Sequence, residues 1–282
     1  MWFWLSVTAG FASAIEKVVN RVTLKNKGNI VAFATIYFSI ITLISFPLSL
    51  PIDIVIIPEL IILLIVQAIF WSLGSLFSFW AQTNTDVSLS QIVSRARIIW
   101  MIPLGFIFLN QRPSIFSMIG MGIIFVGLAT LFFRENIHKY RGIQSMVLGS
   151  IFVACGSVIN AVLVINFLSP AQVTFVTMLG QACVFLVILI VRKNAFKRMK
   201  EIFSRAWYLI VLAAVIETYA FIGINLAFKT GLASAVTSIY LGMTIATVWI
   251  GIILLKEKQH LWRKAISSAI VTAGIIIVKL FT

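Results

Sequence analysis

The sequence predicts an all-α integral membrane protein with about ten transmembrane helices. Its 282 residues are 61% hydrophobic and only 11% charged, whereas a soluble domain carries about 25% charged residues. Mean hydropathy is +1.09, and the apolar residues gather in repeated runs of roughly 20 residues, the length that a helix needs to cross a bilayer. This composition excludes an ordinary soluble globular domain.

Charged residues and Pro/Gly punctuation separate the apolar runs, and no gap between runs has room for a soluble domain. The first run lacks a basic leader, so we expect a retained first span and not a cleaved signal peptide. The short gaps require neighbouring spans to pack antiparallel. The predicted spans are 2–20, 30–50, 59–82, 87–109, 114–133, 143–165, 170–191, 206–228, 233–255 and 260–281.

The formal net charge is +14, but the Lys and Arg residues lie in short gaps between apolar runs and not along one soluble face. We therefore expect membrane lipid, and no nucleic acid, as a partner. The first, fifth, seventh and ninth gaps hold most of the basic residues, including Lys17, Arg21 and the run 192–205. By the positive-inside rule these gaps are cytoplasmic. This orientation predicts a multi-pass protein of the plasma (inner) membrane with both termini extracytoplasmic.

An internal repeat relates the two halves of the chain. Residues 109–114 align with 255–260 without a gap, and the Gly-containing spans that follow also coincide. Each half holds five spans, and because five is odd the halves must insert with opposite orientation. The sequence therefore predicts two inverted five-helix repeats, 1–136 and 137–282, within one transmembrane domain, with a substrate site near the midplane between them.

Short motifs surround the two aligned hairpins. Pro103 precedes the hairpin 110–114, which is followed by Gly120 and Gly127, and the hairpin 256–258 is followed by Gly274. With these motifs the whole chain resembles the EamA-type branch of the drug/metabolite transporter (DMT) superfamily, ten-span carriers built from two five-span halves. The resemblance implies a transporter and not an enzyme.

Two features depart from the pattern of that family. Gln111 occupies a hairpin position where the family commonly has glutamate, and such a glutamate is more plausibly structural than catalytic. The charge bias places both termini outside, where family members often have cytoplasmic termini. The second departure leaves the direction of transport open.

Arg95 and Arg97 lie inside the apolar run 87–109, close to the middle of the hydrocarbon layer. A charged side chain at this depth marks a functional site by default. Two positions apart on a helix, the arginines point in different directions, so we expect one, with Arg97 preferred, to face a cavity and bind a carboxylate or phosphate. The alternative is that both are permanent partners of Glu16, Glu217 or backbone carbonyls.

Glu16 shares a helical stripe with Ser6, Ser13 and Asn20. A carboxylate in a desolvated cavity can exchange protons as the cavity changes its access, and Glu16 resembles in position the first-span glutamate of the small multidrug-resistance relatives. It is therefore the candidate for proton coupling. The alternative is a static ion pair with an arginine or with Lys17 and Arg21.

Glu217 lies in the eighth span, and its repeat counterpart is Trp71 in the third span. If these two stripes face each other, the cavity has an acidic wall and an aromatic wall that suit a cation. Plain helix packing is the alternative for Trp71. Further predicted substrate-binding residues are polar side chains on inward stripes, namely Gln67, Ser78, Asn160, Asn225, Tyr240 and Thr244.

No motif for nucleotide binding occurs, and the Cys and His residues lack metal-binding spacing, so we expect no cofactor and no metal. The energy source is then an ion gradient, with protons as a candidate, or the substrate gradient. Arginine with acidic and aromatic walls favours a secondary carrier for a small polar metabolite, most simply an amino acid or similar zwitterion, in a monomer or homodimer. The alternatives are a carrier of anionic metabolites or nucleotide sugars, a flippase for lipid-linked head groups, and a membrane scaffold.

Overall fold

The computed structural model describes residues 1–24, 29–51, 57–84, 97–130, 142–191, 195–243, 245–246, 249–250 and 261–282. Ten labelled helices and no strand occur within these ranges, which confirms the all-α prediction. Five of the helices are long and apolar enough to cross a membrane by length and composition.

The described helices fall into two groups of five along the chain. The first group is α1 (Trp2–Leu24), α2 (Ile30–Leu48), α3 (Pro58–Asn84), α5 (Arg97–Leu109) and α6 (Ile115–Ala129). The second group is α7 (Gly142–Asn166), α8 (Pro170–Ile190), α9 (Ala195–Thr230), α10 (Ala233–Gly242) and α12 (Leu261–Phe281).

Three boundaries differ from the predicted spans. The first helix continues to Leu24, so Lys17 and Arg21 are helical and do not lie in a connection. Helix α9 begins at Ala195 inside the basic run, and a non-helical residue, Ala206, separates this amphipathic start from the apolar part. The hydropathy pattern marked only the apolar part as helix. Helix α10 ends at Gly242, well before the predicted limit of 255.

Two helix starts show why the chain enters helices where it does. The Asn29 side chain accepts hydrogen bonds from the backbone N–H groups of Val31 and Ala32 at the start of α2. At the start of α8, Ser169 and Gln172 form a capping box, with Pro170 in the first turn. These contacts satisfy backbone donors that have no partner inside a helix.

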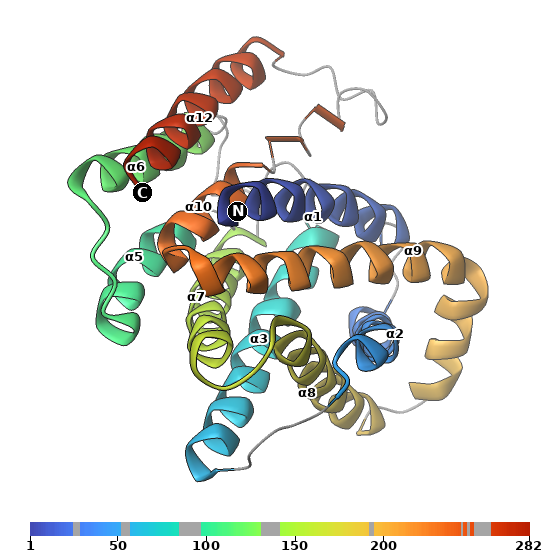
Figure 1. Ribbon diagram of the computed structural model, residues 1–282. Coiled ribbons are helices and arrows are strands. Elements are labelled where there is room, and N and C mark those ends of the chain that lie inside the picture. Colours follow the sequence, from blue (N-terminus) through green and yellow to red (C-terminus); the bar gives the residue numbers. More distant parts are fainter. Residues whose placement is uncertain are drawn as a thin grey trace.

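The helices pack in four long pairs, α1 with α9, α3 with α7, α2 with α8, and α6 with α12. Figure 1 shows α1 lying along α9, with α6 and α12 at one edge of the bundle beside the C-terminus. By their order in each group, α1 corresponds to α7, α2 to α8, α3 to α9 and α6 to α12. Exchanging the two groups therefore turns the pair α1 and α9 into the pair α7 and α3, and leaves the pairs α2 with α8 and α6 with α12 unchanged. Two equivalent halves produce such a pattern, although the inverted repeat itself stays a prediction.

Glycines allow α6 and α12 to approach closely. A Cβ atom added to Gly120 would lie 2.9 Å from the backbone nitrogen of Val278, and one added to Gly274 would lie 2.8 Å from that of Ile124. A Cβ atom on Gly127 would lie 3.0 Å from the nitrogen of Val271. Gly120, Gly127 and Gly274 therefore permit the close contact of α6 and α12, as small residues do between membrane helices.

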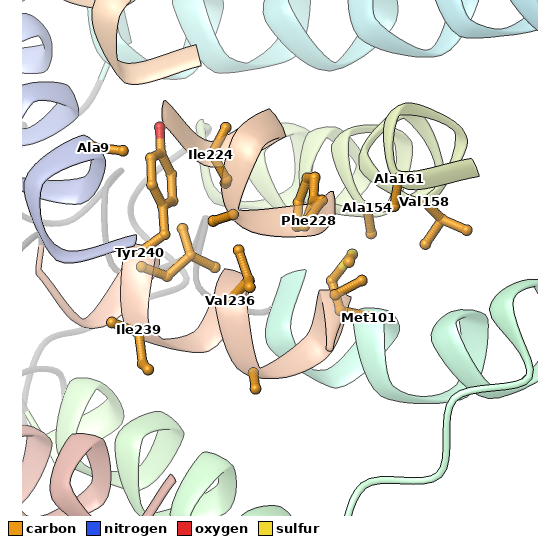
Figure 2. Packing of buried hydrophobic residues seen from close by; sticks show 14 of the residues in the cluster. Ala9, Met101, Ala154, Val158, Ala161, Ile224, Phe228, Val236, Ile239 and Tyr240 are labelled. Carbon is orange, nitrogen blue, oxygen red and sulfur yellow. The ribbon is translucent and has the colours of Figure 1, made fainter. Parts of the chain in front are cut away.

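Buried apolar side chains join the two groups of helices. Ala9, Met101, Ala154, Phe228 and Tyr240 belong to one core cluster. Figure 2 shows Tyr240 extending from α10 beside Ile224 of α9, with its hydroxyl at the far end from Val236. The ring of Tyr240 is therefore part of the core while its polar end points away from it.

Candidate functional site

A cavity lies between the two groups of helices. The space open to the centres of water molecules is about 110 Å³, enough for several waters or for a small solute. Side chains from α1, α2, α3 and α5 of the first group and α7, α8, α9 and α10 of the second line it. The predicted site residues on its wall are Glu16, Trp71, Ser78, Arg97, Asn160, Glu217 and Tyr240.

Glu16 is fully buried and has contacts at both carboxylate oxygens. Its Oε1 accepts a hydrogen bond of 2.7 Å from the Tyr37 hydroxyl and another from the Asn20 amide. Its Oε2 lies 2.6 Å from the Lys17 ammonium. Burial of a charge is costly unless it is paired and hydrogen-bonded, and these three contacts meet that requirement.

Lys17 lines the cavity and does not act only as a cation in a cytoplasmic gap, as the charge pattern suggested. Its side chain is 26% exposed, and its ammonium contacts the carboxylate of Glu16, the preceding residue of α1. The positive-inside count cannot distinguish a cation near a helix end from one that folds back into the bundle. The alternative role predicted for Glu16, an ion pair with Lys17, is present in the structure.

Glu217 and Arg97 carry the other two charges of the cavity. Each has a fully buried polar atom, Oε2 of Glu217 and Nε of Arg97, without a hydrogen-bond partner among the described residues. Arg97 is only 7% exposed, and its guanidinium lies 5.8 Å from the centre of the Tyr240 ring. Neither residue forms an ion pair with another residue in the described ranges, although Glu217 is within Coulombic range of Arg97, Lys17 and Glu16.

A hydrogen-bonded network forms another part of the wall. The Trp71 indole and the Gln67 amide both donate to Asn160 Oδ1, at 3.1 and 2.5 Å. Asn160 in turn donates to Asn225, at 3.3 Å, and Asn225 donates to Thr174, at 3.1 Å. Gln67 and Asn225 are buried behind the wall and are not among the lining residues. The network thus fixes Trp71 and Asn160, which do line the cavity.

Some residues of the site were missed in the sequence, and others cannot be placed. Tyr37 and Gln181 line the cavity and carry no charge that would single them out; for Gln181 a signal was available, because it shares a buried helical face with Thr174 and Thr177. Arg95 and Thr244 lie outside the described residues. Within the described ranges, no three His, Cys, Asp or Glu residues gather in a way that could hold a metal ion.

The hairpin residue Gln111 lies away from the cavity and makes a structural contact. Its Oε1 accepts a hydrogen bond of 2.7 Å from the backbone N–H of Ala233, the first residue of α10. The N-cap residue of α10, Leu232, provides no side-chain hydrogen bond. Gln111 therefore caps a helix that lies 122 positions away in the chain.

Comparison with protein families identifies the first half of the chain. Residues 1–133 match the EamA-like transporter family. These residues are an EamA-like domain. The membership of the DMT superfamily predicted from the hairpin motifs is therefore confirmed, and the family implies a DMT-type transporter in a membrane. A search of curated proteins finds no match.

Solved structures share the fold of this chain. Chains from 28 structure matches are similar to it. One of them, described as "Crystal structure of protein", has a TM-score of 0.74 at 11% identity and covers 99% of this chain and 95% of its own. At this identity the likeness shows the fold alone.

Proposed function

We propose that this protein is a secondary carrier of a small zwitterion, such as an amino acid, and that the substrate binds in the cavity between Arg97 and Glu217. The observation that carries the proposal is that one cavity holds a buried guanidinium and a carboxylate, each with a buried polar atom that lacks a partner. Leaving a buried polar atom unpaired costs about 1–3 kcal/mol, and more for a charged group. A ligand with complementary charges removes both costs.

The chemistry of the two side chains assigns an orientation to the substrate. The planar guanidinium of Arg97 suits a carboxylate, which it can bind through two parallel hydrogen bonds. Glu217 accepts hydrogen bonds and suits an ammonium group. The rings of Trp71 and Phe221, whose centres are 5.0 Å apart, line the same cavity as Glu217 and add an aromatic surface that favours the same cation.

Alternating access is the mechanism that we infer for the transport step. The cavity is lined equally by four helices of each group, and the long helix pairs exchange with one another when the groups are exchanged. Rocking of two similar halves about a central site is the mode of carriers with inverted repeats. The two halves, 1–136 and 137–282, are the moving units in this proposal.

The contacts of Glu16 favour a permanent ion pair over proton coupling. Tyr37, Asn20 and Lys17 all stabilise the ionised carboxylate. Glu217, which lacks such partners among the described residues, is the acidic group left for exchange with the solute. We therefore propose that the substrate gradient or substrate exchange drives transport.

The experiment is a thermal-shift titration of the purified protein with three related probes: norvaline, butylamine, which lacks its carboxylate, and pentanoate, which lacks its ammonium. A ligand at 100 times its Kd stabilises the folded state by about 2.7 kcal/mol. We expect norvaline to raise Tm more than either fragment. Arg97→Gln should lose the response to pentanoate, and Glu217→Gln the response to butylamine.

Matched controls carry the same chemical changes outside the cavity. Arg112→Gln and Glu59→Gln alter exposed residues and should keep the wild-type ranking of the probes. A wider screen includes other amino acids, organic anions, nucleotide sugars and lipid head groups. Stabilisation by anions, nucleotide sugars or head groups, with none by any zwitterion, would contradict the proposed substrate class.

A further inference from the structure

The formal charges of the cavity balance among the residues that the structure describes. Glu16 and Glu217 contribute two negative charges, and Lys17 and Arg97 contribute two positive charges. These four groups are not equivalent, because Lys17 and Glu16 form an ion pair at 2.6 Å, whereas Glu217 and Arg97 form no ion pair with any residue that the structure describes. One positive and one negative site therefore remain for a ligand.

Lys17 determines how many carboxylates of the cavity remain available to a ligand. Without its ammonium, Glu16 would present a second carboxylate to the cavity, because Tyr37 and Asn20 donate hydrogen bonds to it but supply no charge. The Lys17 side chain is close enough to Glu217 for their charges to interact. A solute with a second ammonium group would thus enter a cavity in which the Lys17 ammonium is already paired with the Glu16 carboxylate.

We propose that Lys17 is a specificity-determining residue that occupies Glu16 and so restricts the site to solutes with a single ammonium group. This proposal rests on the proposed function, since it assumes that Arg97 and Glu217 bind the solute. It assigns to Lys17 the exclusion of dibasic solutes, and to Glu16 the matching exclusion of solutes with a second carboxylate, because Glu16 holds the Lys17 cation in place.

The test uses three amino acids with the same five-carbon chain: norvaline, ornithine, which carries a second ammonium, and glutamate, which carries a second carboxylate. Their Kd values are measured by thermal shift or calorimetry on wild-type protein, Lys17→Gln, Glu16→Gln and the double variant. Coulomb attraction in a cavity that excludes much water is strong. We therefore expect Lys17→Gln to shift the norvaline-to-ornithine affinity ratio toward ornithine by at least about tenfold.

The other variants separate charge from shape. Glu16→Gln leaves the Lys17 cation without its partner and should shift the affinity ratio toward glutamate. The double variant removes both charges and should return the ratios toward those of the wild type. If Lys17→Gln leaves a buried charge that prevents folding, Glu16→Gln and the double variant still test the same charge count.

The outcomes distinguish this inference from the function on which it rests. Norvaline binding by the wild type, with affinity ratios that do not change in Lys17→Gln or Glu16→Gln, overturns the role of Lys17 and leaves the proposed carrier intact. Absence of binding of all three amino acids to every variant overturns both. Ratios that move as described, and return in the double variant, support the inference.

Discussion

Replacing Gln111 by alanine removes a cap that one part of the chain supplies to a helix in another part. Gln111 Oε1 accepts the Ala233 N–H at 2.7 Å, Ala233 is 1% exposed, and Leu232 provides no substitute. Loss of an N-terminal cap costs about 0.5–2 kcal/mol, and a buried unpaired N–H costs about 1–3 kcal/mol. We therefore expect Gln111→Ala to lower the free energy of unfolding by about 1–2 kcal/mol.

The assay is thermal unfolding of the purified protein in detergent. A change of 1 kcal/mol moves Tm by about 2–4 °C in chains of 150–250 residues, so the expected decrease is about 2–8 °C. Gln111→Glu keeps an acceptor and places a negative charge at the start of α10, where the helix dipole favours it by about 0.3–1 kcal/mol. Its Tm should equal or exceed that of the wild type.

Gln144 provides the control, because it is an exposed glutamine near the start of α7 and its replacement by alanine should change Tm little. Equal Tm values for Gln111→Ala, Gln144→Ala and the wild type would refute the capping argument. A Tm for Gln111→Glu as low as that for Gln111→Ala would refute the argument that an acceptor at this position is sufficient.

Two further predictions concern the packing of α6 against α12 and the contacts of Glu16 in the cavity. Gly274→Leu forces side-chain atoms against the backbone of Ile124 and Gly120 and should destabilise the protein by about 1–3 kcal/mol. The control is Gly122→Leu, which has nothing within 4 Å of its added Cβ and should be neutral or stabilising because leucine has the higher helix propensity. Equal Tm values for the two variants would contradict the contact between α6 and α12. Tyr37→Phe removes the 2.7 Å hydrogen bond to Glu16 and should lower the free energy of unfolding, measured by chemical denaturation, by about 1–3 kcal/mol. A free energy of unfolding equal to that of the wild type would show that Glu16 does not depend on this donor.

The fold class could be predicted because a bilayer imposes a strong and local constraint. Apolar runs of about 20 residues are readable without tertiary information, and four helices of the first group, α1, α2, α3 and α6, begin within one residue of the predicted limits. The end of α1 was harder to locate, since Lys17 and Arg21 resemble the charges that flank a span. The start of α9 was missed because an amphipathic helix with many basic residues gives a weak hydropathy signal.

The site was most readily predicted where charge is unusual at membrane depth, and polar or aromatic stripes pointed to further wall residues such as Trp71 and Asn160. Arg97, Glu16 and Glu217 are conspicuous in an apolar chain, and all three line one cavity. Tyr37 and Lys17 were not predicted as site residues, because their roles depend on a long side chain that reaches Glu16. The cap from Gln111 to Ala233 joins positions 122 apart, and such a contact leaves no local pattern. The roles of these residues in binding remain predictions.

The most direct test of the account is counterflow in proteoliposomes. Vesicles that contain the purified protein are loaded with unlabelled norvaline and diluted into a trace of labelled norvaline, and the variant with both Arg97→Gln and Glu217→Gln serves as the control. The account predicts transient accumulation of label by the wild type at equal proton concentration on both sides, and none by the double variant. Accumulation by the wild type that does not exceed that of the double variant would contradict the claim that this cavity binds and carries a zwitterion.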